Sequence, residues 1–567
     1  MGWQAISGGI IISILLLIAY SNSFEGPFVF DGKYTIRDNY NIRQLWPIWE
    51  HIISPMKGST VDGRPVANLS LVLNYAINGS DVAGYHAFNL VVHLLSALAC
   101  FGLVSRTLAL SAVPEQVRKR SFVLGLGIAL LWALHPMQTA AVTYINQRVE
   151  AMMGLFYLST LYCFVRGATS PRGLWWYIAS VASCTLGMAT KEVMVSAPLM
   201  VILYDRVFLA GSFKAVIHKR LRVHLAITCT WILLAVLAIR TGDRNGTAGF
   251  TGEVSGWQYL LTQCDMIVRY IRLSIWPHPL VFYYGKERLV DSFAQVWPQA
   301  ASLLVLFTGS LIAMRYRPWL GFLGIWFFAI LSPSSSFIPI ATELGAEHRM
   351  YLSLLSIVSL VVIGGFLLHV RLRERKFVGL LPVLVVLILA FGLMSFSRNQ
   401  DYRTLVSLWK DTTEHDPTNY GAFDNLGCAY REAGEYQNSV DALTRSIELN
   451  PDCEDCYQER GHTYATMGDH EKSLADYGKA IEMKPDFYIV YYKRGSLLLK
   501  LGRYDEALED FDKSVELEER FTAGYDMRGY THLLAGRHEE AMNDFTQAIE
   551  INPNLPNTYH HRAELFY

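Results

Sequence analysis

Residues 351–370 read YLSLLSIVSLVVIGGFLLHV, twenty positions without an acidic residue, a lysine or an arginine. An α-helix of about 20 apolar residues spans the hydrocarbon core of a bilayer. The run follows Glu347-His348-Arg349-Met350 directly and is succeeded by Arg371. This stretch therefore predicts a membrane helix that has polar residues at its start and a basic loop after its end.

Similar apolar runs recur along residues 1–400 and predict a polytopic, all-α membrane domain. We predict 11 membrane helices, at about 4–21, 86–105, 121–137, 150–166, 174–190, 194–210, 223–240, 299–315, 318–335, 351–370 and 377–396. The first run has no cationic residues before it and no small-residue cleavage site after it, which favours an uncleaved helix over a signal peptide. Residues 257–276 are amphipathic, with Asp265, Arg269 and Arg272 on a polar stripe, and predict an interfacial or re-entrant helix.

Composition divides the chain into a membrane part and a soluble part. The 567 residues are 52% hydrophobic and only 17% charged, whereas soluble domains carry about 25% charged residues. Residues 400–567 hold many of the charges, which predicts a membrane domain at 1–400, an adaptor segment at 401–419 and a soluble domain at 420–567. The net charge of −1 gives no electrostatic argument for nucleic-acid binding.

Basic residues fall in every second loop between the predicted helices, and such loops face the cytoplasm. They are Arg106, Arg118, Lys119, Arg120, Arg166, Arg172, Arg206, Lys214, Lys219, Arg220, Arg222, Arg315, Arg317, Arg371, Arg373, Arg375 and Lys376. This pattern predicts a cytoplasmic N-terminus. An odd number of helices then places the C-terminal domain in the periplasm or, in a eukaryote, in the lumen of the endoplasmic reticulum.

Residues 420–567 repeat with a period of 34, which is typical of tetratricopeptide repeats (TPRs). Two sets of glycines keep that spacing: Gly427, Gly461, Gly495 and Gly529, and Gly434, Gly468, Gly502 and Gly536. Four helical hairpins and a terminal first helix are predicted to stack into an α-solenoid. Its concave groove is expected to bind a polypeptide.

Cys453 and Cys456 form a CxxC pair at the start of the second repeat. The soluble part has no second CxxC or histidine pair beside it, so a zinc site is not expected. A disulfide forms there if the domain faces an oxidising compartment.

The loops predicted to lie outside hold several polar motifs. They are Phe28-Val29-Phe30-Asp31-Gly32, Arg64-Pro65, His86 with Asn89 and His93, His135-Pro136, Gln147-Arg148 with Glu150, Lys191-Glu192, and Glu347-His348-Arg349. Each motif alone has a structural alternative: Lys191 and Glu192 as an ion pair, Gln147 and Glu150 as caps of the following helix. Ionisable groups at a membrane boundary are functional candidates. Because all these motifs fall on one face, we expect them to form a single site.

This order of motifs resembles the transmembrane and tetratricopeptide-repeat-containing (TMTC-like) O-mannosyltransferases and their bacterial relatives, within the GT-C glycosyltransferase fold. The resemblance covers nearly the whole chain. It implies transfer of a mannose-like sugar from a polyprenyl-phosphate donor to a protein hydroxyl on the non-cytoplasmic face. It also implies that Asp31 positions or deprotonates the acceptor hydroxyl, and Gly32 stands where the family commonly has a second acidic residue.

The residue types fit that chemistry independently of the resemblance. A sugar phosphate already has a good leaving group, so the catalyst needs a base for the hydroxyl and cations for the departing phosphate. Asp31 is the candidate base. The candidates for binding the donor phosphate are Arg64, His86, His135, Arg148 and Arg349, and those for orienting these groups or binding sugar hydroxyls are Asn89, Gln147, Glu150, Glu347 and His348.

We expect the prenyl chain to lie between membrane helices beside residues 257–276. No tight cluster of acids resembles a metal site, so no metal or other cofactor is expected. The alternative function is a non-enzymatic membrane scaffold in which the repeats recruit partners. A transporter is disfavoured, because residues 1–400 show no internal repeat.

Overall fold

The computed structural model describes residues 2–30, 32–48, 59–242, 254–336, 339–340, 343–372 and 379–566. Its secondary structure is helical, and among these residues the β-pairing is one isolated bridge between Tyr284 and Gly345. The chain forms two compact units, Met1–Asp411 and Thr412–Tyr567. The predicted all-α fold with C-terminal TPR repeats is confirmed.

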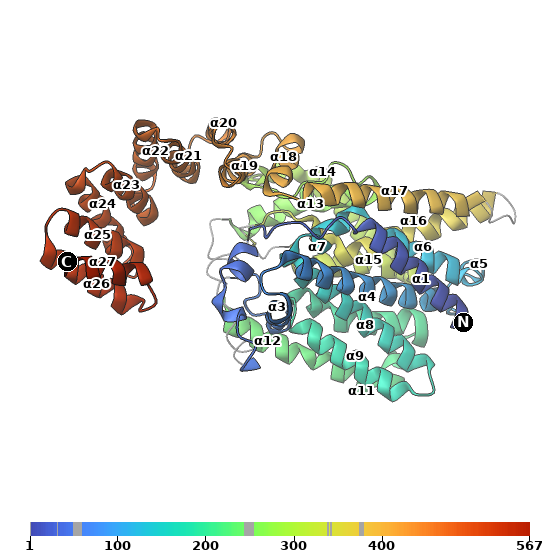
Figure 1. The fold of residues 1–567 in the computed structure, drawn as a ribbon. Helices are drawn as coiled ribbons and strands as arrows, with labels where there is room; N and C mark the ends of the chain where they lie inside the picture. The colour runs from blue at the N-terminus through green and yellow to red at the C-terminus, as the bar shows by residue number, and fades with distance from the viewer. Residues whose placement is uncertain are drawn as a thin grey trace. The chain divides into compact units, whose positions relative to one another are not determined.

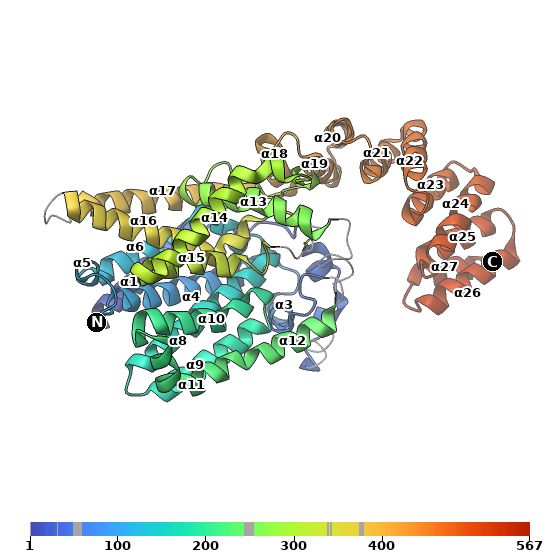
Figure 2. The ribbon, with the colours of Figure 1, turned by 180° about the vertical axis from the view of Figure 1, so that it is seen from behind.

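The first unit is a bundle of apolar helices (Figures 1 and 2). Its long helices are α1 Gly2–Ala19, α4 Val82–Leu108, α6 Ser121–Ala133, α8 Arg148–Thr169, α9 Gly173–Met188, α11 Phe213–Thr228, α12 Thr230–Thr241, α13 Gly256–Ile275, α14 Phe293–Tyr316, α15 Pro318–Leu331, α16 Met350–Leu372 and α17 Leu380–Asp401. The other helices of this unit are α3 Pro65–Asn78, α5 Glu115–Arg118, α7 Thr139–Val142 and α10 Ala197–Tyr204. Eight shorter 3₁₀ or π turns join them: η1 Lys33–Arg37, η2 Tyr40–Ile42, η3 Pro136–Gln138, η4 Ile145–Gln147, η5 Glu192–Ser196, η6 Asp205–Ala210, η7 Lys286–Arg288 and η8 Glu347–Arg349.

All eleven predicted segments are helical, but the count of eleven membrane spans is not confirmed. By length and composition, seven helices in the described part of the chain can cross a membrane, and an eighth can if one bent pair is counted. That pair joins Ser121–Ala133 to Pro136–Val142 at an angle of 52°. The bend follows from Pro136, because a proline disfavours helical geometry in the residue before it.

The span predicted at 223–240 corresponds to the stretch that follows a break in α11 at Arg220 (φ −140°, ψ 22°), although Phe213–Thr241 counts as one candidate span by length and composition. Two other helix predictions need correction. The span predicted at 194–210 is a composite of η5, α10 and η6. The region predicted as a polar loop at 21–85 contains the helix α3, which starts at Pro65, a residue favoured at the first helical position.

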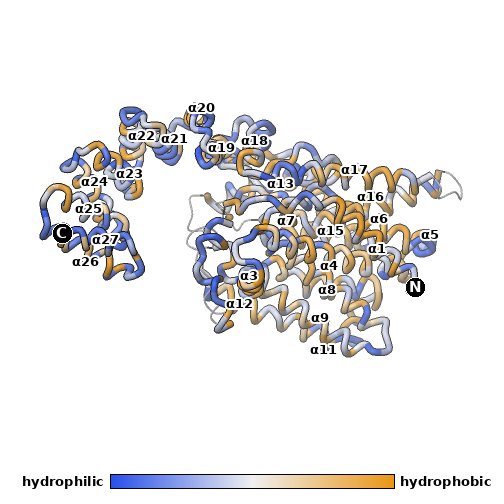
Figure 3. The backbone as a smooth tube through the Cα atoms, viewed as in Figure 1, coloured by the Kyte–Doolittle hydropathy of each residue, from blue (hydrophilic) through white to orange (hydrophobic). Residues whose placement is uncertain are grey.

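Hydrophilic segments gather at the two ends of the bundle (Figure 3). The N-terminus and α5, which Lys119 and Arg120 follow, lie at one end, and α3 with the loop that follows α1 lies at the other (Figure 1). The buried core between them is formed by aliphatic and aromatic side chains, including Trp132, Tyr157 and Phe164. The predicted orientation of the bundle in the membrane stays a prediction.

The second unit is a TPR solenoid of four helix pairs and a last helix. Its helices are α19 Tyr420–Glu432, α20 Tyr436–Leu449, α21 Glu454–Met467, α22 His470–Met483, α23 Tyr488–Lys500, α24 Tyr504–Leu517, α25 Thr522–Leu534, α26 His538–Ile551 and α27 Pro556–Glu564. Before them, α18 Leu405–His415 forms the predicted adaptor helix.

The two sets of periodic glycines have separate physical causes. A Cβ atom added to Gly427, Gly461, Gly495 or Gly529 would come within 2.4 to 3.1 Å of the large side chain that the second helix of the same repeat packs there. Gly434, Gly468, Gly502 and Gly536 have φ between 73° and 86°, a conformation that favours glycine. The first set therefore allows close helix packing, and the second closes the turns.

A periodic ion pair that the sequence analysis missed joins the two helices of repeats two, three and four. Each pair is bidentate: Arg460 with Asp476 at 2.8 and 2.9 Å, Arg494 with Asp510 at 2.8 and 2.7 Å, and Arg528 with Asp544 at 2.9 and 2.6 Å. Both members recur every 34 residues, so the repeat period alone could have revealed them. Cys453 and Cys456 are joined by a disulfide at the start of α21.

Asp424, on α19, gives the solenoid a measurable pH dependence. Burial and the nearby carboxylates of Glu459 and Asp455 raise the pKa of Asp424 to about 7. Between about pH 4 and pH 7 the folded chain therefore holds a proton that the unfolded chain has released, so this group lowers the free energy of unfolding as the pH rises. Burial lowers the pKa of His462 to about 4. Between about pH 4 and pH 6.5 the unfolded chain therefore holds a proton that the folded chain has released, so this group raises the free energy of unfolding as the pH rises.

We predict that Asp424→Asn removes the first effect and leaves the second. The difference in the free energy of unfolding between Asp424→Asn and the wild type should grow from pH 4 to pH 7 and then level off. Urea titrations of the whole chain in detergent, followed by circular dichroism, measure this difference. The contribution of His462 cancels, because both proteins contain this residue. Parallel stability curves for the two proteins over this range would contradict the prediction.

Candidate functional site

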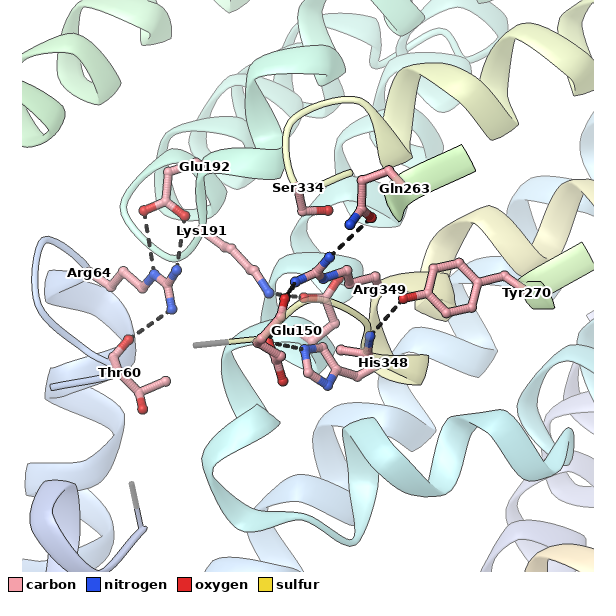
Figure 4. Close-up of polar contacts among 12 residues, drawn as sticks. Thr60, Arg64, Glu150, Lys191, Glu192, Gln263, Tyr270, Ser334, His348 and Arg349 are labelled. Carbon is pink, nitrogen blue, oxygen red and sulfur yellow. Dashed lines mark hydrogen bonds and ion pairs between the residues drawn. The ribbon is translucent and has the colours of Figure 1, made fainter. Parts of the chain in front are cut away.

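Arg349, in the turn η8, is held by a network of hydrogen bonds (Figure 4). Its side chain is buried, and Nη1 donates to Tyr259 Oη at 3.1 Å and to Gln263 Oε1 at 3.4 Å. Its Nη2 donates to the backbone carbonyl of Glu343 at 2.5 Å. The guanidinium is therefore fixed in position by α13 on one side and by its own loop on the other.

The loop before η8 is attached to α13 through its backbone. Tyr270 Oη accepts a hydrogen bond from the Ala346 N–H at 2.6 Å, and Gln263 Nε2 donates to the Leu344 carbonyl at 2.7 Å. Tyr259, Gln263 and Tyr270 lie on one face of α13, at i, i+4 and i+11. The amphipathic helix predicted from the sequence thus positions the start of α16.

Two further ion pairs lie beside this network (Figure 4). Lys191 pairs with Glu150, and these side chains are 11% and 2% exposed. Arg64 pairs with Glu192 at 3.0 Å, with side chains 10% and 41% exposed. The structure therefore pairs Lys191 with Glu150 rather than with its neighbour Glu192, the structural alternative considered from the sequence.

We call Arg64, Glu150, Lys191, Glu192, His348 and Arg349 the polar cluster. Lys191, Arg349 and Arg64 all lie within electrostatic range of His348, so residues from α3, α8, η5 and η8 converge on one place. His348 Nε2 lies 3.6 Å from Glu343 Oε2. Four of the predicted site residues, Arg64, Glu150, His348 and Arg349, are thus brought together.

The carboxylates of this region differ in exposure, and this difference bears on ligand binding. Glu150 is buried beneath Lys191, whereas the side chains of Glu192 and Glu343 are 41% and 35% exposed. Glu192 and Glu343 are thus the carboxylates that solvent reaches, whereas Glu150 is enclosed with Lys191.

Asp31 lies outside the described residues, but both of its neighbours in the chain are described. A Cβ atom built at Gly32 would lie 3.7 Å from Asn146 Oδ1. Asn146 Nδ2 donates to Thr60 Oγ1 at 3.3 Å, and Arg64 Nη1 donates to the Thr60 carbonyl at 2.8 Å. A short series of contacts thus leads from the residue after Asp31 to the polar cluster.

The other histidines and Asn89 bind backbone carbonyls instead of joining the polar cluster. His86 Nε2 lies 2.9 Å from the Gly26 carbonyl, and His135 Nε2 lies 3.2 Å from that of Ser274. Asn89 Nδ2 donates to the carbonyls of Val142 and Ile145, both at 3.2 Å. These buried contacts hold the ends of helices and loops in place, and the predicted phosphate-binding role of His86 and His135 stays a prediction.

The Arg148 side chain contacts residues of α3 and α4. It is buried, donates to Asn74 Oδ1 at 3.1 Å, and lies over the rings of Tyr85 and Phe88 at 5.2 and 4.7 Å. This arrangement ties α8 to α3 and α4. Its predicted role in binding the donor phosphate also stays a prediction.

Glu347 points away from its neighbours His348 and Arg349. Its Oε1 accepts hydrogen bonds from the Val281 N–H at 2.7 Å and from Tyr284 Oη at 3.1 Å. The carboxylate therefore positions the loop that follows α13, and its predicted role in orienting the cations or binding sugar hydroxyls stays a prediction.

Three buried amide oxygens around η4 accept no hydrogen bond from the described residues. They are Asn89 Oδ1, Asn146 Oδ1 and Gln147 Oε1. A buried acceptor without a donor is costly, by about 1–3 kcal/mol. A ligand rich in hydroxyl groups would supply the missing donors. Within the described ranges, no group of three or more His, Cys, Asp or Glu side chains is placed to hold a metal ion, and metal independence stays a prediction.

Sequence reasoning left four residues of this region out of the candidate site: Lys191, Tyr259, Gln263 and Tyr270. Lys191 belongs to one of the polar motifs expected to form the site, but the sequence assigns it no role of its own. The α13 residues share a helical face, so their spacing was a usable signal, but the charged stripe of Asp265, Arg269 and Arg272 dominated the pattern. Their role depends on tertiary contact with η8, which the sequence does not contain.

The buried Lys191–Glu150 pair leads to a stability prediction. Lys191→Met leaves the Glu150 carboxylate buried without its cation, and we expect a loss of about 3 kcal/mol in the free energy of unfolding. Replacing Glu150 by Gln in the same chain removes the stranded charge and should restore most of the loss. Thermal unfolding in detergent, followed by tryptophan fluorescence, measures both effects.

The matched control is Lys119→Ala. Lys119 pairs with Glu115 at 2.8 Å, but the two side chains are 72% and 64% exposed, so the change should be within about 0.5 kcal/mol. If Lys191→Met were as stable as Lys119→Ala, the pair would not have the structural role described.

Comparison with known proteins agrees with both parts of the chain. Models described as tetratricopeptide repeat match residues 420–453, 488–521 and 522–555, and one described as TPR repeat matches 461–502. Solved structures of MamA and YrrB cover 26% and 31% of this chain, and 86% and 89% of their own, at 22% and 20% identity. Their TM-scores are 0.25 and 0.26, so they add nothing to what the repeats themselves show.

Curated relatives extend into the membrane part. Protein O-mannosyl-transferase F38B6.6 of Caenorhabditis elegans is 22% identical over 474 residues, 80% of this chain and 64% of the relative. Protein O-mannosyl-transferase Tmtc3 of Drosophila melanogaster is 22% identical over 524 residues, 78% of this chain and 55% of the relative. For human protein O-mannosyl-transferase TMTC2, the match is 27% identical over 241 residues, 40% of this chain and 27% of the relative.

The chain thus spans less than two thirds of the length of these curated relatives. The matched relatives are named protein O-mannosyl-transferases, and this chain carries TPR repeats and a region of apolar helices, in which seven candidate spans occur within the described residues. These matches support the resemblance of the chain to the TMTC-like family.

Proposed function

We propose that the protein is a membrane glycosyltransferase. It transfers a mannose-like sugar from a polyprenyl phosphate to a hydroxyl group of a protein. The observation that supports this proposal most directly is the polar cluster, in which three cations from distant segments lie within electrostatic range of His348. The names of the relatives support the same class of reaction.

In the proposed reaction the acceptor oxygen attacks the anomeric carbon of the sugar. A new bond forms between that carbon and the acceptor oxygen, while the bond from the carbon to the phosphate oxygen breaks. The hydroxyl proton passes to the Asp31 carboxylate, and the polyprenyl phosphate leaves with the bonding electron pair. Asp31 acts as the general base, and cations stabilise the leaving phosphate.

Arg64 and Arg349 are the proposed phosphate ligands, because their carboxylate partners are partly exposed and replaceable. Arginine can hold two phosphate oxygens at once. Lys191 adds a third positive charge, and its ion pair with the buried Glu150 keeps it in place. Asn89 and Gln147, with unsatisfied amide oxygens, are the proposed partners of sugar hydroxyls. The prenyl chain would lie among the membrane helices beside α13.

We propose a cytoplasmic N-terminus and a TPR unit on the non-cytoplasmic side, where its groove presents the acceptor polypeptide. α5, which the basic residues Lys119 and Arg120 follow, lies at the same end of the bundle as the N-terminus, which supports this orientation (Figure 1). The Cys453–Cys456 disulfide supports an oxidising compartment for the TPR unit.

The alternative is a non-enzymatic scaffold that uses its repeats to recruit other proteins. One observation favours it: each of Arg64, Lys191 and Arg349 already has a carboxylate neighbour, as in a purely structural network. Activity measurements on Asp31 separate the two functions.

We predict that Asp31→Asn lowers kcat for sugar transfer by about 100-fold or more, the scale of a lost general base, without weakening donor binding. Transfer of radiolabelled mannose from a polyprenyl phosphate to a serine-containing peptide measures the rate. The matched control is Asp38→Asn on the same loop, whose carboxylate pairs with Arg37 at 3.0 Å and is half exposed, and which should keep normal activity. Full activity of Asp31→Asn at a normal protein level would rule out the proposed mechanism.

A further inference from the structure

Four aromatic rings from three separate segments meet next to Asp31. Phe30 stacks on Phe282 at a centroid distance of 5.7 Å and an angle of 14°, and it meets the edge of Trp409 at 4.9 Å. Tyr283 lies 5.7 Å from Phe30. We call Phe30, Phe282, Tyr283 and Trp409 the aromatic cluster. It joins the loop after α1, the loop after α13 and the helix α18.

The cluster has a buried base and a partly exposed surface. Trp409 is 3% exposed, and Phe282 also packs against Tyr402 and Tyr144, which are 3% and 8% exposed. Phe30, Phe282 and Tyr283 are only partly buried. Their rings therefore form a rigid apolar surface, because the residues behind them cannot move without opening the core.

The backbone at Phe30 is strained. Its φ is +46°, in the left-handed region that few residues other than glycine adopt, and a bulky residue there is an outlier. Such strain persists only where surrounding contacts fix the conformation, and it gathers at functional sites. Here the contacts with Phe282 and Trp409 fix the residue that directly precedes Asp31.

Trp409 is itself held by a buried ion pair. Arg398 near the end of α17 is 7% exposed and pairs with Asp411, two residues after Trp409 on α18, and with Asp401 at 3.1 Å. Arg398 also lies 5.6 Å from the ring of Tyr402. The ion pair fixes the middle of α18 against the end of α17, so the aromatic cluster is preorganised.

The two neighbours of Asp31 face different surroundings. Phe30 contacts the aromatic cluster, whereas Gly32 lies beside Asn146, which leads to Arg64 and the polar cluster. A transferase must hold the leaving phosphate and the attacking group on different sides of the sugar. The cations occupy the Gly32 side, so the Phe30 side is left for the acceptor.

We propose that the aromatic cluster is the acceptor subsite, and that it binds an apolar or proline side chain adjacent to the serine or threonine that receives the sugar. This inference rests on the proposed function and names the substrate class of that site. Partly exposed, rigid aromatic rings bind aliphatic and proline side chains in extended peptides. The cluster thereby sets which hydroxyls of a polypeptide are modified.

A peptide side chain fits this surface better than the donor sugar does. A hexose needs several accessible polar partners, and the polar groups beside the rings are engaged or enclosed. Glu347 Oε1 is occupied by the Val281 N–H and by Tyr284, and Arg398 Nη1 is paired with two aspartates. Arg398 Nε, Arg398 Nη2 and Tyr402 Oη accept or donate no hydrogen bond within the described residues, but these atoms are buried. Apart from the Tyr283 hydroxyl, the accessible part of the cluster is therefore apolar.

The test uses Phe282→Ala and Tyr283→Ala in the whole chain, with two acceptor peptides that differ only in having proline or glycine next to the threonine. The wild type should prefer the proline peptide, and each variant should reduce that preference about three- to tenfold through the acceptor KM. The KM for the polyprenyl-phosphate mannose, and its slow hydrolysis without acceptor, should stay unchanged. Tyr34→Ala is the matched control, since Tyr34 is 67% exposed and lies on the same polar loop.

Three results would overturn the proposal: a wild type without preference, an unchanged preference in both variants, or a raised donor KM with an unchanged acceptor KM. The last result would assign the cluster to the donor sugar.

A second measurement does not depend on transfer. A photo-crosslinking amino acid at position 283 should capture the proline peptide more efficiently than the glycine peptide in the absence of donor. Capture without any transfer activity would reject the glycosyltransferase function but keep a peptide subsite, whereas equal capture of both peptides would reject the subsite.

Discussion

The membrane unit depends on the pairing of buried charge at one end of its helices. Lys191 and Glu150 are both almost fully buried, and a lone charge in such a place costs several kcal/mol. Pairing them fixes η5 against α8, and through Arg64 and Glu192 it also brings α3 to the same place. Arg349 is held separately by α13 and by the backbone before η8. Lys191 is therefore paired with the buried Glu150, whereas Arg64 and Arg349 are paired with Glu192 and Glu343, which are partly exposed. Such a set of cations suits an anion that binds, reacts and leaves, because replacing an exposed carboxylate costs little.

The sequence predicts the architecture well where a repeating pattern carries it. The 34-residue period of glycines predicts the TPR solenoid, and the structure explains each glycine by a close helix contact or a positive φ. Apolar runs predict the positions of the membrane helices, but not their exact form. Pro136 bends one helix, π and 3₁₀ turns flank α10, and α3 lies in a region whose polar residues suggest a loop. These features depend on local backbone constraints and on packing against other segments, neither of which changes the average hydrophobicity of a window.

The candidate site is predicted only in part. Arg64, Glu150, His348 and Arg349 meet as expected, because a charge at a membrane boundary needs a partner and their helices end at the same face. His86, His135 and Arg148 carry the same chemical types, yet they hold backbone carbonyls or stack on aromatic rings. Sequence cannot separate these groups, since the distinction is made by which helix packs beside each side chain. Tyr259, Gln263 and Lys191 join the region for the same reason. The aromatic cluster is also a product of tertiary structure, because Phe30, Phe282 and Trp409 are far apart in the chain and share no motif.

We propose that Arg64 and Arg349 exchange their exposed carboxylate partners for the phosphate of a lipid-linked sugar. The most direct measurement is an electron cryo-microscopy structure of the protein in lipid nanodiscs with bound polyprenyl phosphate. We expect phosphate density within hydrogen-bonding distance of both guanidinium groups, with Glu192 and Glu343 turned away and the Lys191–Glu150 pair intact. Phosphate bound elsewhere, with the Arg64–Glu192 pair unchanged, would contradict it.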